Sequence, residues 1–308
     1  MLIYEGARKG GKNITFTKQS VKELDQKISL IPLSYDIVFK GVFKRNLDLL
    51  KKFLNVTLPI TIGKEDKVQI IDGELPVLNK NEHGEIVDIL VVINKTIFVD
   101  IEMNRSKFEN VVERNIEYKN RISNLIFEKG ENIKQLKEKR LYQINLNANP
   151  SEEILEDVIV LYGTKTKKIY SPNDTIVKGL ERYRDLYYNG VKDEDVIWLT
   201  ILTARTFTEL YELVSIVLEE DEVKRLMEMV VNMSMDEFTI HSWQKDKMDA
   251  LVKYNELEEA TNKGRAEGIK ENQTQIVKNM LNMKMSLEDI SKATGLTIQD
   301  IQELQKQS

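Results

Sequence analysis

Three acidic side chains stand in a segment that is otherwise almost wholly apolar. The segment VDILVVINKTIFVDIEMN, residues 87–104, carries Asp88, Asp100 and Glu102. Two carboxylates held close together repel each other unless a pKa rises or a cation lies between them. Mg²⁺ suits such a pair, because it binds through one or two carboxylates and keeps its waters for a phosphate. The pattern therefore allows two interpretations: a site for a hard cation, or the solvated face of an amphipathic hairpin.

The turn between the two apolar runs decides which side chains share a face, because side chains alternate along a strand. A three-residue loop over residues 94–96 places eight apolar side chains together: Val87, Ile89, Val91, Ile93, Ile97, Val99, Ile101 and Met103. The same loop sets Asp88 across from Glu102 on the other face, with Asp100 and Asn104 nearby, and opposed Cβ atoms lie about 4.5–5.5 Å apart. A two-residue loop would bury unpaired carboxylates among valines, which is costly. The pattern predicts the three-residue loop.

The composition narrows the chemistry that is available. The 308 residues include no cysteine and two histidines, His83 and His241. This excludes disulfides and thiolate zinc sites, and it leaves little room for histidine metal cages or Ser/His/Asp schemes. Catalysis must therefore rest on carboxylates, lysines and tyrosines.

Charge and hydropathy bear on partners and location. The net charge is −5 at pH 7, so a nucleic-acid partner would be met by a local basic face. The sequence has no apolar run near the roughly 18 residues that a spanning helix needs, and its start lacks the order of a secretory signal. We therefore expect a soluble cytoplasmic protein with no membrane partner.

The periodicity predicts an α/β core of about 150 residues. Expected elements are a helix from about Ser34, a short extended piece at residues 68–71, the acidic hairpin, a helix at residues 107–129, a strand at residues 141–146 and a hairpin at residues 156–170. Beyond residue 190 the pattern is almost wholly helical. We expect a flexible N-terminal arm (residues 1–30), the core (31–190), a helical region (191–259), a linker (260–272) and a helical hairpin (273–308).

The C-terminal hairpin allows two interpretations. Ser286 and Thr297 each begin an S/T-x-x-D/E helix start, with Gly295 between them. In a DNA-docking helix-turn-helix the second helix, from about Thr297, would enter the major groove. That helix carries two acids and almost no positive charge besides Lys306. A dimerisation or packing hairpin is therefore favoured.

Three stretches of the sequence belong together: YDIVFKGVF at residues 35–43, the hairpin with DIEMN at residues 100–104, and the helix with Arg114 and Tyr118. They resemble the Rpn family of recombination-promoting nucleases and transposases in the PD-(D/E)XK superfamily, and the first is similar to that family's opening D-x-x-F-K-x-x-F helix. The resemblance runs from about residue 33 to 147. The resemblance implies an α/β fold, with a restriction-endonuclease-like mixed sheet flanked by helices. The helical pattern farther along the chain predicts an all-α region and then a small helical hairpin.

The resemblance also implies metal-assisted phosphodiester hydrolysis. Asp88 matches the first metal-binding aspartate and Glu102 the second acid; with the backbone carbonyl of Met103 they would hold Mg²⁺, for which Mn²⁺ would substitute. Asn104 stands where the superfamily has lysine and this family commonly has glutamine. Asn104 would hold the attacking water, but an amide cannot neutralise developing charge as lysine does.

Further candidates lie on the two helices. Arg114, Tyr118 and Arg121 recur at i, i+4 and i+7, so they project from one side and would grip the DNA backbone without reading sequence. The alternative is an ordinary solvated helix face. Lys40 is a further DNA-binding candidate and Asp36 a further site candidate, although their spacing is more often that of an ion pair.

Two functions stay open on this reading. The first is a Mg²⁺-dependent DNA endonuclease acting in recombination, mobile-element biology or defence, which the pair Asp88 and Glu102 favours. The second is a catalytically weak module that binds DNA or protein, which Asn104 favours. Cutting both strands of a duplex commonly needs two active sites, so the first function also favours a homodimer.

Overall fold

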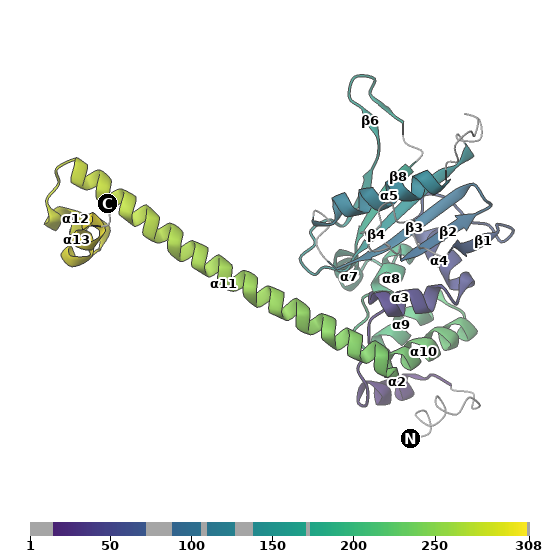
Figure 1. Cartoon of the computed structure of the whole chain (residues 1–308). Coiled ribbons are helices and arrows are strands. Elements are labelled where there is room, and N and C mark those ends of the chain that lie inside the picture. The colour runs from purple at the N-terminus through teal and green to yellow at the C-terminus, as the bar shows by residue number, and fades with distance from the viewer. Residues whose placement is uncertain (1–14, 72–87, 106–109, 127–137, 171–172, 307–308) are drawn as a thin grey trace. The chain divides into compact units, whose positions relative to one another are not determined.

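The computed structural model describes residues 15–71, 88–105, 110–126, 138–170 and 173–306. The chain forms two compact units, Met1–Trp243 and Gln244–Ser308. In Figure 1 the first unit holds every labelled strand. None of the helices in the described ranges is long and apolar enough to cross a membrane.

Six strands of the first unit form one mixed sheet. They are β1 (Val68–Ile71), β2 (Ile89–Ile93), β3 (Ile97–Asn104), β4 (Arg140–Asn147), β5 (Glu156–Ile159) and β8 (Asn173–Gly179). Their spatial order is β1-β2-β3-β4-β8-β5. The three central strands β3, β4 and β8 run parallel, and the other neighbours pair antiparallel. The predicted mixed sheet is confirmed.

The predicted three-residue loop of the acidic hairpin is also confirmed. Ile93 pairs with Ile97, so residues 94–96 form the loop. Asn94 and Lys95 adopt positive φ angles of 51° and 63°, and Thr96 N donates to Ile93 O at 3.1 Å. Left-handed residues of this kind give a turn whose twist matches that of the two strands. Val87, the first residue of the expected apolar face, lies outside the described residues.

Helices cover both faces of the sheet, which gives three layers (Figure 1). One face packs on α5 (Val112–Ile126), where Ile122 and Ile126 contact Leu90 and Leu141. The other face contributes to a large apolar core. The helices that build this core are α2 (Lys18–Asp25), α3 (Asp36–Phe43), α4 (Leu47–Thr57), α7 (Leu180–Tyr188), α8 (Glu194–Ile201), α9 (Phe207–Val217) and α10 (Glu220–Met235).

The N-terminal part of the chain differs from the loose arm that the sequence suggests. Helix α2 begins at Lys18, directly after its N-cap Thr17. Val21 and Leu24 of α2 are buried in the main core. Asp25 then accepts hydrogen bonds from the backbone N–H groups of Phe207 (2.6 Å) and Thr208 (3.0 Å) at the start of α9. Burial and these hydrogen bonds fix residues 15–30; the rest of the expected arm lies outside the described residues.

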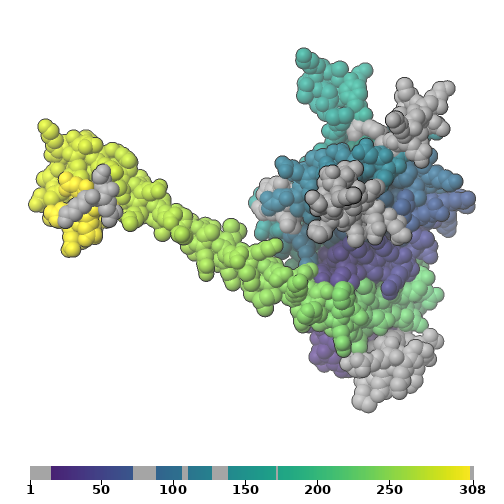
Figure 2. Space-filling model, in the orientation of Figure 1, coloured from purple at the N-terminus to yellow at the C-terminus, as the bar shows by residue number. Residues whose placement is uncertain are grey.

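The region at residues 156–170 differs in its strand pairing from the expected hairpin, whereas the region beyond residue 190 is helical in its described residues, as predicted. A short pair, β6 (Tyr162–Gly163) and β7 (Lys168–Ile169), forms the tip of the expected hairpin and projects from the surface in Figure 2. β5, however, pairs with β8, a strand that the sequence analysis does not predict. Helices α8 to α10 pack in the same apolar core as the sheet. Trp198 of α8, for example, contacts the ring of Phe53 in that core. Residues 191–243 therefore belong to the first compact unit.

The expected linker at residues 260–272 is helical. It lies inside α11 (Glu237–Asn282), which runs through Gly264 and Gly268 without interruption. An isolated glycine costs a helix about 1 kcal/mol, and the neighbouring Ala, Glu, Lys and Arg residues are strong helix formers. The two glycines are therefore tolerated within the helix.

The second unit contains the predicted helical hairpin. Its helices are α12 (Leu287–Thr294) and α13 (Ile298–Lys306), which pack on the end of α11 through Val277, Ile290 and Ile301. Ser286 caps α12 by accepting from Asp289 N at 3.2 Å, and Thr297 accepts from Asp300 N at 3.1 Å. Gly295 has the φ angle of +72° that the left-handed end of α12 requires.

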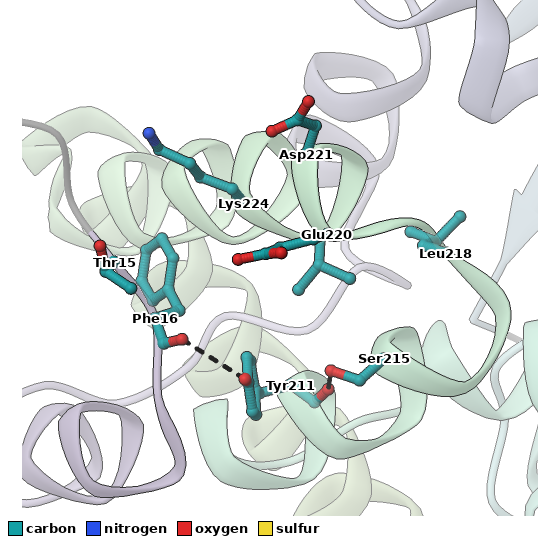
Figure 3. A pocket seen from close by; sticks show the side chains of 9 residues that line it. Thr15, Phe16, Tyr211, Ser215, Leu218, Glu220, Asp221 and Lys224 are labelled. Atoms are coloured by element: carbon teal, nitrogen blue, oxygen red, sulfur yellow. Dashed lines mark hydrogen bonds between the residues drawn. The ribbon is translucent and has the colours of Figure 1, made fainter.

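A pocket of about 450 Å³ opens beside α9 and α10 in the first unit (Figure 3). Tyr211 and Ser215 of α9 line it together with Glu220, Asp221 and Lys224 of α10. Tyr211 Oη donates to Phe16 O at 3.3 Å along its wall. None of the candidate residues from the acidic hairpin or from α5 lines this pocket.

Candidate functional site

Six polar side chains form a buried ladder on the α5 side of the sheet. In the parallel register of β3 and β4, Asp100 pairs with Gln143, Glu102 with Asn145 and Asn104 with Asn147. All six are buried, and the most exposed of them, Glu102, shows 4% of its surface to solvent. Because alternate residues of a strand share a face, the patterns D-x-E-x-N and Q-x-N-x-N bring these groups together. The acidic face is therefore not the solvated face of a simple hairpin.

Asp88, the residue directly before β2, also contacts this ladder. Its Oδ2 accepts from Met103 N at 2.8 Å, and its own N–H donates to Glu102 Oε1 at 3.4 Å. Asp88 and Glu102 thus lie on the same side of the sheet, as the three-residue loop predicts. The side chain of Met103 packs toward the main core on the other side, so its backbone is the part of Met103 that meets the acids.

The three acids are strongly perturbed by their surroundings. Burial, helped by the charge of Asp88, raises the pKa of Asp100 to about 7 against hydrogen bonds from Gln143 and Glu102. Burial, followed by repulsion from Asp100 and Asp88, raises the pKa of Glu102 well above its usual range. Burial and the charge of Asp36 also raise the pKa of Asp88, although Lys40 opposes them. The three carboxyl groups therefore favour a shared proton or a bound cation over full ionisation.

Lys40 links the acidic ladder to α3. Its Nζ lies 2.8 Å from a carboxylate oxygen of Asp36 and 2.8 Å from one of Asp88. Burial lowers the pKa of Lys40, but Asp88 and Asp36 outweigh it, so the pKa of Lys40 is raised. The expected i, i+4 ion pair of Asp36 and Lys40 is confirmed, and it extends to Asp88. A DNA contact of Lys40 stays a prediction.

Asn104 is held by a closed ring of hydrogen bonds. Its Oδ1 accepts from Arg114 Nη2 at 2.7 Å, and its Nδ2 donates to Asn145 Oδ1 at 3.3 Å. Asn115 Nδ2 donates to the same Asn145 oxygen, while Asn115 Oδ1 accepts from Arg114 Nε at 3.4 Å. Each amide is thereby oriented by two neighbours, and Asn104 has a fixed direction relative to the acids.

The predicted basic stripe on α5 does not behave as one uniform face. Arg114 reaches into the ladder, and its guanidinium carbon lies 5.7 Å from the centre of the Tyr118 ring. Arg121 pairs instead with Glu117 on the same helix, at 3.0 Å. The stripe therefore holds one residue that contacts the candidate site and one that belongs to a local ion pair.

Sequence reasoning missed four residues: Gln143, Asn145 and Asn147 of the ladder, and Asn115 of α5, which donates to Asn145. The signal for three of them is present in QINLN, residues 143–147, where polar residues alternate with apolar ones in a strand that is buried on both faces. Gln143 Nε2 donates to Asp100 Oδ2 at 3.0 Å and to Asn115 O at 2.8 Å. An alternating strand normally has one solvated face, so the pattern alone does not reveal that α5 covers it.

The donor set fits a hard divalent cation. The described residues contain no group of three or more His, Cys, Asp or Glu side chains arranged to hold a metal ion. Asp88 and Glu102, however, supply the one or two carboxylates that Mg²⁺ ordinarily takes from a protein. Asp100 Oδ1 is buried and has no hydrogen-bond donor among the described residues unless Glu102 carries a proton. A cation beside these acids would relieve that unpaired charge.

Comparison with known proteins identifies the family of the chain. Residues 33–260 match the family model for the PD-(D/E)XK nuclease family transposase, a span that includes the whole sheet and the helices on both its faces. Searches of curated proteins and of solved structures give no match. Since the matched span is most of the chain, the protein belongs to the PD-(D/E)XK nuclease family of transposases.

Proposed function

We propose that the protein is a Mg²⁺-dependent DNA endonuclease whose metal-binding pair is Asp88 and Glu102. The observation that carries the proposal is the direct approach of these two residues, with Asp88 N donating to Glu102 Oε1 at 3.4 Å inside a buried acidic ladder. Membership of a nuclease family supports the reaction class. The DNA substrate, the choice of Mg²⁺ and a role in recombination or mobile-element biology are parts of the proposal.

The proposed ligands are the carboxylates of Asp88 and Glu102 and the backbone carbonyl of Met103. Bound there, Mg²⁺ or Mn²⁺ would supply an activated water and positive charge at the scissile phosphate. The raised pKa values of the acids support this, because a cation lets buried carboxyl groups ionise that otherwise retain a proton. Lys40, whose Nζ lies 2.8 Å from a carboxylate oxygen of Asp88, would contact the DNA backbone.

The remaining residues have positioning roles in the proposal. Asn104 has its amide fixed by Arg114 and Asn145 and would orient the attacking water. Tyr118 and Arg121, farther along α5, would contact the DNA backbone and set its path without reading sequence. Asp36 would act through Lys40, whose amine it binds at 2.8 Å.

A plasmid-nicking assay with Mg²⁺ tests the proposal. Asp88→Ala and Glu102→Gln should each lower the rate on the order of 10³-fold, because each removes a ligand that supplies several kcal/mol of charge stabilisation. Arg205→Gln is the matched control, since Arg205 lies in an exposed pair with Glu181 and should cleave like the wild type. Equal cleavage by all four proteins would refute the assigned site.

Asn104 supports a second candidate, a catalytically weak module that binds DNA. Its amide cannot neutralise charge as the lysine of the superfamily does. This candidate predicts that the wild type binds duplex DNA but leaves it uncut with Mg²⁺ or Mn²⁺. The same plasmid assay, run beside a gel-shift titration, separates the two functions.

The C-terminal hairpin is proposed as a dimerisation or packing unit. Asp300 and Glu303 in α13 leave its helix face without the positive charge that a DNA-docking helix needs. A homodimer would give the two active sites that double-strand cleavage requires. Sedimentation of the full chain measures this: a monomer at micromolar concentration would contradict the dimer.

A further inference from the structure

Arg114 makes contacts that an ordinary solvated helix face does not account for. It lies in the first turn of α5 and is itself exposed, yet its Nη2 donates to Oδ1 of Asn104, which is 1% exposed. Its guanidinium therefore connects the buried ladder with the surface at which a DNA substrate would lie.

Two buried amides fix this guanidinium. Asn115 Oδ1 accepts from both Nε and Nη2 of Arg114 at 3.4 Å, and Asn115 is tied through Asn145 to Asn104. The guanidinium carbon of Arg114 also lies 5.7 Å from the centre of the Tyr118 ring. A residue that only gripped the outer DNA backbone would have no need of a buried ring of amides. Holding a charge in place before the reaction is the feature that makes electrostatic stabilisation effective.

The guanidinium of Arg114 lies beside the acidic ladder, since its Nη2 donates to Asn104 Oδ1 at 2.7 Å. Asn104, the residue that Arg114 holds, is two positions after Glu102 on the same face of β3. Arg114 thus places a positive charge beside Asn104, an uncharged residue at the position where the superfamily has lysine.

We propose that Arg114 contacts the scissile phosphate and supplies the positive charge that the superfamily takes from a lysine at the position of Asn104. The inference rests on the proposed function. In the hydrolysis, the hydroxyl of one water bonds to phosphorus, the bond from phosphorus to one ester oxygen breaks, and the water's remaining proton goes to the departing oxygen. Negative charge grows on the other phosphate oxygens meanwhile. A guanidinium stabilises it with paired N–H donors.

Single-turnover cleavage of a labelled duplex, with its affinity measured separately in EDTA, tests this role. Arg114→Gln should lower the rate constant of the saturated complex about 100-fold or more, the usual effect of removing one transition-state donor, and change the dissociation constant by less than about threefold. Arg114→Lys should retain part of the rate, since it keeps the charge but loses the fork. Arg205→Gln should match the wild type in both measurements.

A second substitution tests whether charge at this place is what matters. Asn104→Lys, introduced into the Arg114→Gln variant, should restore at least about tenfold of the lost rate, because the amine then stands at the superfamily position. A thermal melt of each variant separates a lost role from a lost fold, and the Arg114 variants alone decide the matter if the double variant does not fold.

The outcomes separate this inference from the function on which it rests. If Arg114→Gln weakens DNA binding and leaves the saturated rate unchanged, Arg114 is a backbone contact and the inference is wrong, while the nuclease stands. If a folded double variant stays as slow as Arg114→Gln, the inference is also wrong. If the wild type itself does not cleave, the proposed function fails, and this role fails with it.

Discussion

The two faces of the six-stranded sheet are both covered by helices, but they are built from different chemistry. One face buries rings and aliphatic chains in a single core that α3, α4 and α8 share. The other buries carboxyl and amide groups under α5, with a small apolar cluster beside them. Apolar burial stabilises a fold without further conditions, whereas each buried polar group requires a partner. Burying the polar groups costs free energy, and the fold itself does not require them. The polar face therefore points to function.

The largest expected effect lies on the apolar face. Phe53 is fully buried and contacts the rings of Phe39, Phe43 and Trp198. Phe53→Ala should lower the free energy of unfolding by about 3–5 kcal/mol, through lost burial and the cavity that remains. Urea denaturation measures it.

The control makes the same substitution at an exposed ring. Phe238 in α11 is 69% exposed, so Phe238→Ala should change the free energy of unfolding by less than about 0.5 kcal/mol. Equal effects at the two positions would show that the apolar face is not the main source of stability.

The polar face should respond to pH in the opposite way from an ordinary surface carboxylate. Asp100 has its pKa raised to about 7 by burial, while in the unfolded chain it titrates near 3.9. The folded protein therefore keeps a proton that the unfolded chain has lost. In metal-free buffer the free energy of unfolding should fall as pH rises from about 4 to 7, by about 1.4 kcal/mol per pH unit for one such carboxyl.

Asp100→Asn should flatten this pH dependence in part, since Glu102 and Asp88 retain their raised pKa values. The measurement is urea denaturation in EDTA at several pH values. Asp249→Asn, at an exposed position of α11, is the control and should keep the slope of the wild type. A slope that Asp100→Asn leaves unchanged would mean that Asp100 is ionised in the folded protein.

The sequence predicts the apolar face and the position of the acids better than it predicts the rest of the polar face. The alternation of Ile89, Val91 and Ile93 sets the hairpin phase, and the phase brings Asp88 and Glu102 together. These are local regularities that a single segment carries. The helix starts at Ser286 and Thr297 are local in the same way.

Features that depend on distant partners are not predictable in this manner. β8 was missed because its buried polar residues look like loop residues: Thr175 donates to Gln143 Oε1 at 3.4 Å and Lys178 pairs with Glu156 at 2.7 Å. The spacing on α5 predicts a surface contact for Arg114, because its acceptor Asn104 becomes a neighbour only through the packing of α5 on β3. Such contacts exist only in the folded chain.

Binding of Mn²⁺ to the metal-free protein, measured by isothermal titration calorimetry, tests the central claim most directly. The account predicts saturable binding by the wild type that Asp88→Ala and Glu102→Gln each weaken at least tenfold, while Asp249→Asn binds as the wild type does. Binding that survives both substitutions unchanged would show that these two carboxylates do not share a cation, and it would contradict the assignment of the site.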